Sequence, residues 1–324
     1  MKSVFTALLI LTSACAAPAF AQDWPNRAVR IIVPFGAGGS ADILARVVAE
    51  HLSAAFKQQF VVENRTGAGG AIGAQEISRA APDGYTIGMT NLSTLSLVPV
   101  INTTIAYDPI TDFTHINYVA GAPVVLAANP KTDVKTLKEF IAYANAPDKS
   151  FTFASSGVGS DGHLMGQAIA LSTKIKVEHV PYKSTSQALT DIVAGHVPFS
   201  TFTLSSTAQF LRAGQLNGIA VTSPERMPDY PDLPTFKEFG HADLVGTTWF
   251  SMSGPAKLPA DITERLNREI AAAVSKPEIQ ARFRRDGFIA LPMSSADFTK
   301  FVAAENARWK PLIEGAGLAG KGGN

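Results

Sequence analysis

The sequence predicts an α/β protein with mainly parallel sheets, because short apolar strands alternate with helices along most of the chain. Three observations lead to this prediction. Strand, glycine-rich turn and helix recur in that order from Val29 onward. The helical stretches carry apolar residues at three- and four-residue spacing, as in 40–56. Finally, 46% of the 324 residues are apolar and 17% are charged, which is ordinary for a folded globular protein.

The first 21 residues are typical of a secretory signal peptide. An apolar run covers 4–11, and Ala19-Phe20-Ala21 has the small residues of a cleavage site. The run is too short to span a bilayer. Cys15 would carry the lipid of a lipoprotein, but Thr12 stands where such a signal needs a large apolar residue. We therefore expect removal of 1–21 and a soluble product in the periplasm.

Charge and cysteine content exclude several classes of function. The 28 basic and 27 acidic residues give a net charge of +1, so no electrostatic footprint for nucleic acid is present. The one cysteine leaves with the signal peptide, which excludes disulfides and thiol chemistry in the mature chain. The six histidines show no paired ligand spacing. We expect neither a metal nor a cofactor.

The elements of the first series follow from short apolar runs and from capping residues. Val29 to Val33 is an apolar strand, and 40–56 is a helix for which Ser40 is the expected N-cap. The same order then repeats, with strands expected at 60–63 and 85–90 and a helix at 71–80.

A second series begins near Pro123, and its helices are marked by polar caps. Ser184 and Gln187 form a capping-box pattern before one of them. Strands are expected at 124–128, 151–154, 177–180, 197–203 and 218–222, with helices at 136–145, 163–171, 184–194 and 207–213. After Gly246 the pattern predicts a strand at 248–252 and helices at 260–275, 277–285 and 295–313.

Three turns are unusually rich in glycine and serine, at 35–42, 66–70 and 155–160. Glycine allows backbone N–H groups to approach a ligand, and a helix N-terminus adds unpaired donors with a partial positive charge. Hydroxyl-rich runs at 90–94 and 201–206 also follow strands. Because ligands of α/β sheets bind beyond the carboxyl ends of strands, these turns predict a neutral site for an anion such as a carboxylate. The alternative is that each turn only connects a strand tightly to a helix.

Two short motifs suggest an enzyme instead. Gly36, Gly38 and Ala41 match a dinucleotide-binding fingerprint, with Glu63 as the acid for a ribose, but free dinucleotide is unexpected outside the cytoplasm. The neighbouring residues Ser160, Asp161 and His163 suggest a hydrolase triad. However, the nucleophile-elbow motif needs glycine where Val158 stands, and triads are assembled from separate elements.

The chain resembles the periplasmic solute-binding receptors of tripartite tricarboxylate transporters, the Bug family. The resemblance covers essentially the whole mature chain and rests on motifs that occur in the family's order. They are Trp24-Pro25, Ile32-Val33-Pro34-Phe35 with Gly38-Gly39 and Asp42, Val62-Glu63-Asn64-Arg65 with Gly67-Ala68-Gly69-Gly70, Ala81-Pro82-Asp83-Gly84-Tyr85-Thr86, Tyr107-Asp108-Pro109, Ala154-Ser155-Ser156-Gly157 with Gly159-Ser160 and His163-Leu164, Val180-Pro181-Tyr182-Lys183, and Trp249-Phe250 with Pro255.

This resemblance implies a two-lobed, type II-like periplasmic binding protein with its ligand cleft between the lobes. Lobe 1 would comprise residues 22–121 plus 246–324, and lobe 2 would comprise 122–245. The protein would be a monomeric receptor rather than an enzyme. It would bind a small carboxylate through backbone amides and water, and deliver it to the large and small membrane subunits of the transporter. A ligand sensor for a two-component system and an exported hydrolase using Ser160 and His163 remain as alternatives.

Positions that match the family's motifs supply the candidate ligand-binding residues. Lobe 1 would contribute Phe35, Gly38, Gly39, Ser40, Ser93 and Thr94, and lobe 2 would contribute Ser156, Gly157, Gly159, Ser160, Tyr182 and Lys183. The chain departs from the family where Gly36 replaces a proline, and where Phe202 and Thr203 replace an aspartate and an asparagine. We therefore expect a ligand that is not an amino acid, and an aromatic or apolar acid that stacks on Phe202.

Overall fold

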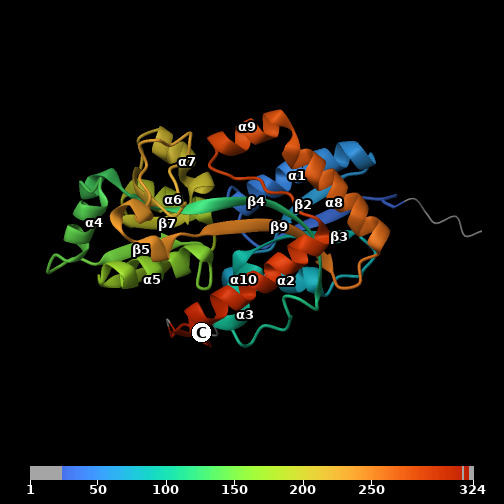
Figure 1. Cartoon of the computed structure of the whole chain (residues 1–324), viewed down its shortest axis with the longest axis horizontal. Helices are drawn as coiled ribbons and strands as arrows, with labels where there is room; N and C mark the ends of the chain where they lie inside the picture. The colour runs from blue at the N-terminus through green and yellow to red at the C-terminus, as the bar shows by residue number, and fades with distance from the viewer. Residues whose placement is uncertain (1–23, 316, 321–324) are drawn as a thin grey trace, which may run out of the picture.

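The computed structural model describes residues 24–315 and 317–320, so the expected signal peptide at 1–21 lies outside the described residues. One mixed sheet runs through the molecule in the order β2-β1-β3-β9-β4-β7-β5-β6, with β8 paired to β4 (Figure 1). Its strands are β1 (Val29–Val33), β2 (Phe60–Asn64), β3 (Thr86–Asn91), β4 (Phe113–Ala128), β5 (Phe151–Ser155), β6 (Val177–Pro181), β7 (Phe199–Thr203), β8 (Asn217–Val221) and β9 (Thr247–Pro255).

Helices cover both faces of this sheet. They are α1 (Ser40–Phe56), α2 (Ala71–Ser78), α3 (Val98–Ile101), α4 (Leu137–Ala144), α5 (Asp161–Thr173), α6 (Thr185–Ala194), α7 (Leu204–Arg212), α8 (Ala260–Ser275), α9 (Pro277–Arg285) and α10 (Ser295–Gly315). A π-helical turn, Ser93–Leu97, precedes α3. Among the residues that the structure describes, no helix is long and apolar enough to cross a membrane.

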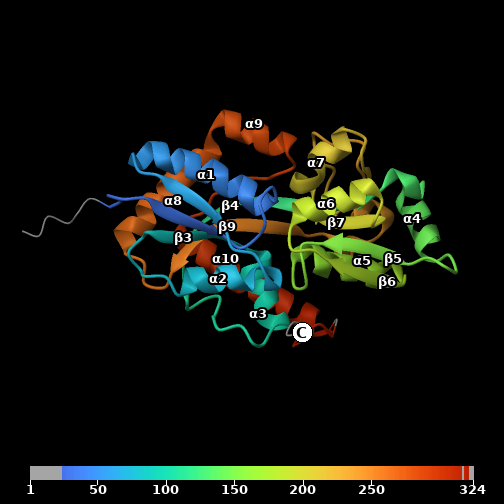
Figure 2. The same cartoon turned by 180° about the vertical axis from the view of Figure 1, so that it is seen from behind.

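Strands β4 and β9 join the two ends of the molecule. The first part of β4 pairs with β9 as far as Pro123, and from Val124 onward β4 pairs with β7 and β8. Figure 2 shows α1, α2 and α8 around the β1–β3 end and α4 to α7 around the β5–β8 end. All pairings that involve β4 or β9 are antiparallel, whereas β1, β2 and β3 pair in parallel, as do β5, β6 and β7. The expectation of mainly parallel sheets therefore holds only away from these two crossing strands.

Each end of the sheet has its own apolar core. At the β1–β3 end, the apolar stripe of α1, which includes Leu44 and Val48, packs on Ile31 and on Leu266 of α8. At the β5–β8 end, aromatic rings dominate, and the rings of Phe140 and Phe151 meet edge to face at 4.9 Å. Burial of these side chains is the main stabilising contribution to each end.

Most helices and short strands lie within two residues of their expected positions, but three details differ. The strand expected at 124–128 is only the last part of β4, and the helix expected at 207–213 begins at Leu204. The part of β4 before 124 contains Asn117, Gly121 and Pro123, which obscure the strand pattern. Ser40 is the first helical residue of α1, and Gly39 occupies the N-cap position. The hydroxyl of Ser40 therefore does not cap its own helix.

Candidate functional site

Four helices begin at one small cavity between the two ends of the sheet. Ser40 of α1, Asp161 of α5 and Thr185 of α6 are first residues of their helices, and Thr203 is the N-cap of α7. All four residues line a cavity of about 30 Å³, which we call the inner chamber. Because the N-terminal end of a helix carries a partial positive charge, the four N-termini direct that charge toward this chamber, although the first N–H groups of α5 are already bonded to the Asp161 carboxyl and to Ser160 Oγ.

The inner chamber is lined by hydroxyl groups, an amide, a carboxyl and aromatic rings, and its lining includes neither lysine nor arginine. A site of this kind can bind an anionic group through neutral donors. This volume is more than one ordered water molecule needs. The lining residues are Phe35, Gly39, Ser40, Ala41, Asn91, Ser156, Asp161, Gly162, Thr185, Thr201, Phe202, Thr203, Ser206 and Phe250.

A cluster of hydroxyl groups joins the two ends of the sheet beside this chamber. The hydroxyl of Ser40 lies 2.6 Å from Thr203 Oγ1, 2.6 Å from Ser205 Oγ and 2.9 Å from Ser206 Oγ. Ser40 belongs to α1, whereas its three partners lie at the start of α7. Only 4% of Ser40 is exposed, so these hydrogen bonds form away from bulk solvent and hold the cleft closed.

Asp161 contributes the only carboxyl group in the lining of the inner chamber. Burial raises the pKa of this carboxyl above its usual value of 3.8. A hydrogen bond from the Thr248 hydroxyl, 2.7 Å from Oδ2, and bonds from the backbone N–H groups of Asp161 and Gly162 act in the opposite direction. Ionised Asp161 would repel a bound carboxylate, whereas protonated Asp161 would donate a hydrogen bond to it.

A larger cavity of about 510 Å³ adjoins the inner chamber, and we call it the outer chamber. Phe35 and Ser156 line both chambers and stand at their junction. The outer chamber is otherwise walled by the turns 66–70 and 156–158, and Lys183 is the only cation in its lining. Tyr182 also lines it and donates a hydrogen bond to Asp191, at 2.8 Å. Burial and this acid raise the pKa of Tyr182 to about 12, so its hydroxyl stays protonated.

Close backbone contacts complete the closure of the cleft. The hydroxyl of Ser93 donates to the carbonyl of Gly69 on its own side and to that of Gly159 across the cleft, each at 2.8 Å. Ser186 donates to the carbonyl of Ala37 at 2.6 Å. A Cβ at Gly69 would lie 2.6 Å from the carbonyl oxygen of Val158, so this contact requires glycine.

The structure brings most of the sequence-predicted residues to the two chambers. Phe35, Gly39, Ser40, Ser156, Phe202 and Thr203 line the inner chamber, and Gly157, Tyr182 and Lys183 line the outer one together with Phe35 and Ser156. Gly38, Ser93, Thr94, Gly159 and Ser160 line neither chamber. Their predicted contact with a ligand stays a prediction.

The five residues that line neither chamber make other hydrogen bonds. Ser93 and Gly159 are joined across the cleft as described, and Gly38 N–H donates to Asp42 Oδ2 at 3.0 Å. The hydroxyl of Thr94 lies 3.1 Å from both oxygens of Asn91. Ser160 is the N-cap of α5, where its hydroxyl accepts from the backbone N–H of His163 at 3.2 Å.

The residues proposed for a hydrolase triad do not form a relay in this arrangement. Besides its capping bond, the fully buried hydroxyl of Ser160 donates to Ser155 Oγ at 3.3 Å. The imidazole of His163 accepts from the Gly159 N–H through Nδ1 at 3.3 Å and stacks on His179, with ring centroids 4.1 Å apart. The carboxyl of Asp161 bonds to Thr248 instead of to either partner.

Glu63, the acid of the dinucleotide fingerprint, is already held in ion pairs with two arginines. Glu63 accepts two hydrogen bonds from Arg30, at 2.9 and 3.0 Å, and one from Arg65 at 2.9 Å. These ion pairs lower the pKa of Glu63 and direct its carboxylate toward the two arginines.

Several lining residues were not among the candidates, although signals for most of them exist. Asn91 and Thr201 belong to the hydroxyl-rich runs 90–94 and 201–206, and Thr185 lies at the start of the expected helix 184–194, so their neighbourhood was predicted but not the residues themselves. Asp161 was considered only for a triad. Its position in the chamber follows from the N-terminal turn of α5, where the first residue faces the sheet's carboxyl edge.

Comparison with known proteins shows the family to which the chain is related. A family model described as "Tripartite tricarboxylate transporter family receptor" matches residues 44–318. The chain is 32% identical over 315 residues to protein BugT of Bordetella pertussis, covering 96% of this chain and 95% of BugT. Among solved structures, R. palustris Rpa4515 with adipate is 32% identical, with a TM-score of 0.88 over 92% of this chain and 99% of that one.

Two further structures agree in fold. The periplasmic binding protein BugD is 30% identical, with a TM-score of 0.88 over 91% of this chain and 99% of its own. MatC (Rpa3494) from Rhodopseudomonas palustris with bound malate is 27% identical, with a TM-score of 0.85 over 89% and 99% of the two chains. The chain therefore belongs to the tripartite tricarboxylate transporter receptor family, the Bug proteins, and has the two-lobed α/β fold of its periplasmic binding proteins.

Proposed function

We propose that the protein captures a small organic carboxylate in the cleft between its lobes and delivers it to a tripartite tricarboxylate transporter. The observation that carries the proposal is the convergence of four helix N-termini on a chamber whose lining contains no cation. Such a site suits one carboxylate group held by neutral donors. Rpa4515 and MatC, which are relatives of this chain, were solved with the dicarboxylates adipate and malate.

The two chambers suggest how a carboxylate would be oriented. One carboxylate would enter the inner chamber beside Ser40 and Ser156, displacing part of the hydroxyl network. The remainder of the ligand would occupy the outer chamber, whose volume of about 510 Å³ leaves room for a second polar group near Lys183. This arrangement favours a dicarboxylate.

An aromatic acid remains the second ligand class. Phe202 lines the inner chamber, where stacking is expected, but it is only 4% exposed because it also packs in an apolar cluster. A chamber of about 30 Å³ does not admit an aromatic ring, so stacking on Phe202 would require the lobes to separate further. We expect a ligand that is not an amino acid because Phe202 stands where the family carries an aspartate. Asp161, however, supplies a carboxyl group to the same chamber, which weakens this argument.

We also propose the cellular setting. The mature chain would work as a monomer in the periplasm after removal of 1–21, with the large and small membrane subunits of the transporter as partners. Lobe 1 would comprise 22–121 plus 246–324, and lobe 2 would comprise 122–245. Support for these boundaries comes from β4, which exchanges β9 for β7 and β8 after Pro123, and from β9, which begins at Thr247.

A thermal-shift panel tests the proposal. The mature chain would be heated with C4 to C6 di- and tricarboxylates, benzoates, phthalate isomers, nicotinate and acidic amino acids. A ligand that binds only the folded state raises the melting temperature. We expect at least one dicarboxylate to do so. The shift should disappear in Ser156→Phe, which fills the junction of the chambers, and persist in Ser78→Phe, a matched half-buried serine at the end of α2. A folded protein that responds to no carboxylate would contradict the proposal.

A further inference from the structure

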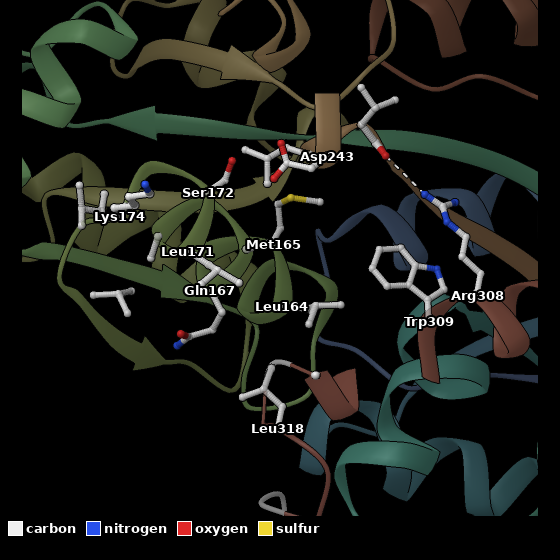
Figure 3. Close-up of a pocket in the computed structure, with 17 residues that line it drawn as sticks. Leu164, Met165, Gln167, Leu171, Ser172, Lys174, Asp243, Arg308, Trp309 and Leu318 are labelled. Atoms are coloured by element: carbon white, nitrogen blue, oxygen red, sulfur yellow. Dashed lines mark hydrogen bonds between the residues drawn. The ribbon is translucent and has the colours of Figure 1, made fainter. Parts of the chain in front are cut away.

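A third cavity lies outside the cleft, between α5 and the C-terminal part of α10. Its volume is about 650 Å³, and none of its lining residues lines the inner or the outer chamber. Its walls include Leu164, Met165, Ala168, Leu171, Trp309 and Leu318, and we call it the α5–α10 groove. Figure 3 shows the side chains of α5 on one side and those of Trp309 and Leu318 on the other.

The first wall of the groove is an apolar face of α5. Ile169 of this helix is fully buried in the core of the β5–β8 end, so one face of α5 is already used. Ala168 is partly buried against the same core, whereas Leu171 lies outside it and is 72% exposed, although a surface helix ordinarily carries polar residues on its outer face. An exposed leucine at the edge of an apolar cavity is available for contact with an apolar ligand.

The opposite wall offers an aromatic ring beside a cation. The indole N–H of Trp309 donates to Glu305 at 3.0 Å, and the ring, which is 9% exposed, belongs to an apolar cluster with Leu164 and also lines the groove. The guanidinium of Arg308 lies 5.1 Å from the Trp309 ring centroid. Its contacts with Glu305 and with the carbonyl of Val245 are long, at 3.4 Å each, and half of the side chain is exposed. Arg308 therefore retains donors for a further anionic partner.

The charges of the groove favour an anion. Three charged side chains line it, and two of them, Arg308 and Lys174, are basic, whereas Asp243 is acidic. Arg308 and Lys174 stand toward opposite ends of the groove, with the apolar side chains of α5 between them (Figure 3). A ligand that fits this pattern has an apolar body and an anionic group at one end.

We propose that the α5–α10 groove is a second binding site, which takes an amphiphilic carboxylate. Its apolar body lies between Leu164, Ala168 and Trp309, and its carboxylate pairs with Arg308. A volume of about 650 Å³ is within the range of sites for small molecules. The two chambers of the cleft are lined mainly by glycine-rich turns and hydroxyl groups, whereas the groove is lined mainly by leucine, isoleucine, methionine and tryptophan side chains. The two sites therefore differ in the class of carboxylate that each accepts.

Helix α5 forms the wall between the two sites. Asp161 at its first turn lines the inner chamber, and Leu164 lines the groove. A small void of about 10 Å³ lies between them and is lined by Asp161, Leu164 and Trp309. The groove is thus adjacent to the cleft but closed off from it by packed side chains.

Isothermal titration calorimetry with sodium decanoate tests the proposal, with decanol and butyrate as partial probes. Decanol has the apolar body without the charge, and butyrate has the charge with little body. We expect decanoate to bind and both partial probes to bind at least about tenfold more weakly, since a charge-assisted hydrogen bond and a buried apolar chain each contribute that much.

Matched variants locate the site. Leu171→Glu places an acid in the groove and should weaken decanoate binding about tenfold or more. Leu291→Glu introduces the same change at another exposed leucine, which does not line the groove, and should have no effect. Arg308→Gln should weaken decanoate but not decanol.

Three results would overturn the proposal. They are no binding of decanoate to the folded protein, equal effects of Leu171→Glu and Leu291→Glu, and equal affinity for decanoate and decanol. The first would leave the groove as a contact face for a protein partner. The response of the protein to the cleft ligand is measured separately by the carboxylate panel, so failure of one proposal leaves the other standing.

Discussion

Substitution of Gly69 by alanine would oppose closure of the cleft. The new Cβ would lie 2.6 Å from the carbonyl oxygen of Val158 on the other lobe, roughly 0.8 Å short of ordinary contact. Overpacking of this kind costs about 1–3 kcal/mol, and the cost falls on the closed state because only closure brings the two groups together. Since about 1.4 kcal/mol corresponds to a factor of ten, the Kd should rise about 5- to 150-fold.

Backbone strain must be separated from this clash. Gly69 has a φ of +64°, so alanine there is also strained by about 1–2 kcal/mol. Gly214 is a matched control because its φ is +66° and a Cβ would meet nothing within 4 Å. Both variants should lose similar backbone stability, but only Gly69→Ala should lose affinity. Calorimetry with the best carboxylate of the panel, together with small-angle X-ray scattering at saturating ligand, measures both effects. Equal Kd values for the two variants would refute the reasoning.

Three further predictions follow from buried groups. Because burial raises the pKa of Asp161, carboxylate affinity should fall as the pH rises through that raised value, and Asp161→Asn should bind more tightly at neutral pH and lose this dependence in titration calorimetry. Burial lowers the pKa of His115 to about 4 and that of His179 to about 3, so the unfolded chain takes up protons below about pH 6.5 while the folded chain does not. Both histidines contribute fully to the free energy of unfolding above that pH. About 2 kcal/mol per histidine should be lost by about pH 5, as measured by unfolding in urea, and His179→Gln should show only half of the combined loss. Ser160→Ala should cost about 1 kcal/mol of stability through loss of the α5 cap and leave the carboxylate Kd unchanged, whereas a rise in Kd would favour the sequence-based assignment of Ser160 to the ligand.

Elements with local signals could be predicted from the sequence. The bounds of α8 and α9 agree with the expected 260–275 and 277–285, because an apolar stripe defines one and a proline begins the other. A capping box was expected at Ser184, and the structure shows one half of it, in which the Ser184 side chain accepts a long bond of 3.5 Å from the Gln187 N–H. Such signals depend only on neighbours along the chain.

Features that depend on distant partners could not be predicted. The first part of β4 is a strand because it pairs with β9, far along the chain, and Gly121 and Pro123 obscure its pattern. The hydrogen bonds of Ser40 with α7 arise from closure of the cleft, which no local pattern encodes. For the same reason, the positions of Ser93 and Ser160 within the motifs did not reveal that their hydroxyls are already bonded elsewhere.

The sequence predicts which turns lie at the candidate ligand site, but not which side chains line it. The glycine- and hydroxyl-rich turns predicted the edge of the sheet at which the two chambers lie, since strand ends and helix starts meet there. Which face of each turn points into a chamber depends on backbone geometry, such as the φ of +116° at Gly157 and of +82° at Gly159. Those two residues lie two positions apart, yet only Gly157 lines a chamber.

A crystal structure of the protein with the best carboxylate of the panel tests the central claim most directly. The account predicts one carboxylate in the inner chamber, in contact with Ser40 and Ser156, with the rest of the ligand extending past Phe35 into the outer chamber. A ligand bound in the α5–α10 groove with the inner chamber empty, or one whose carboxylate lies only at Lys183, would contradict it.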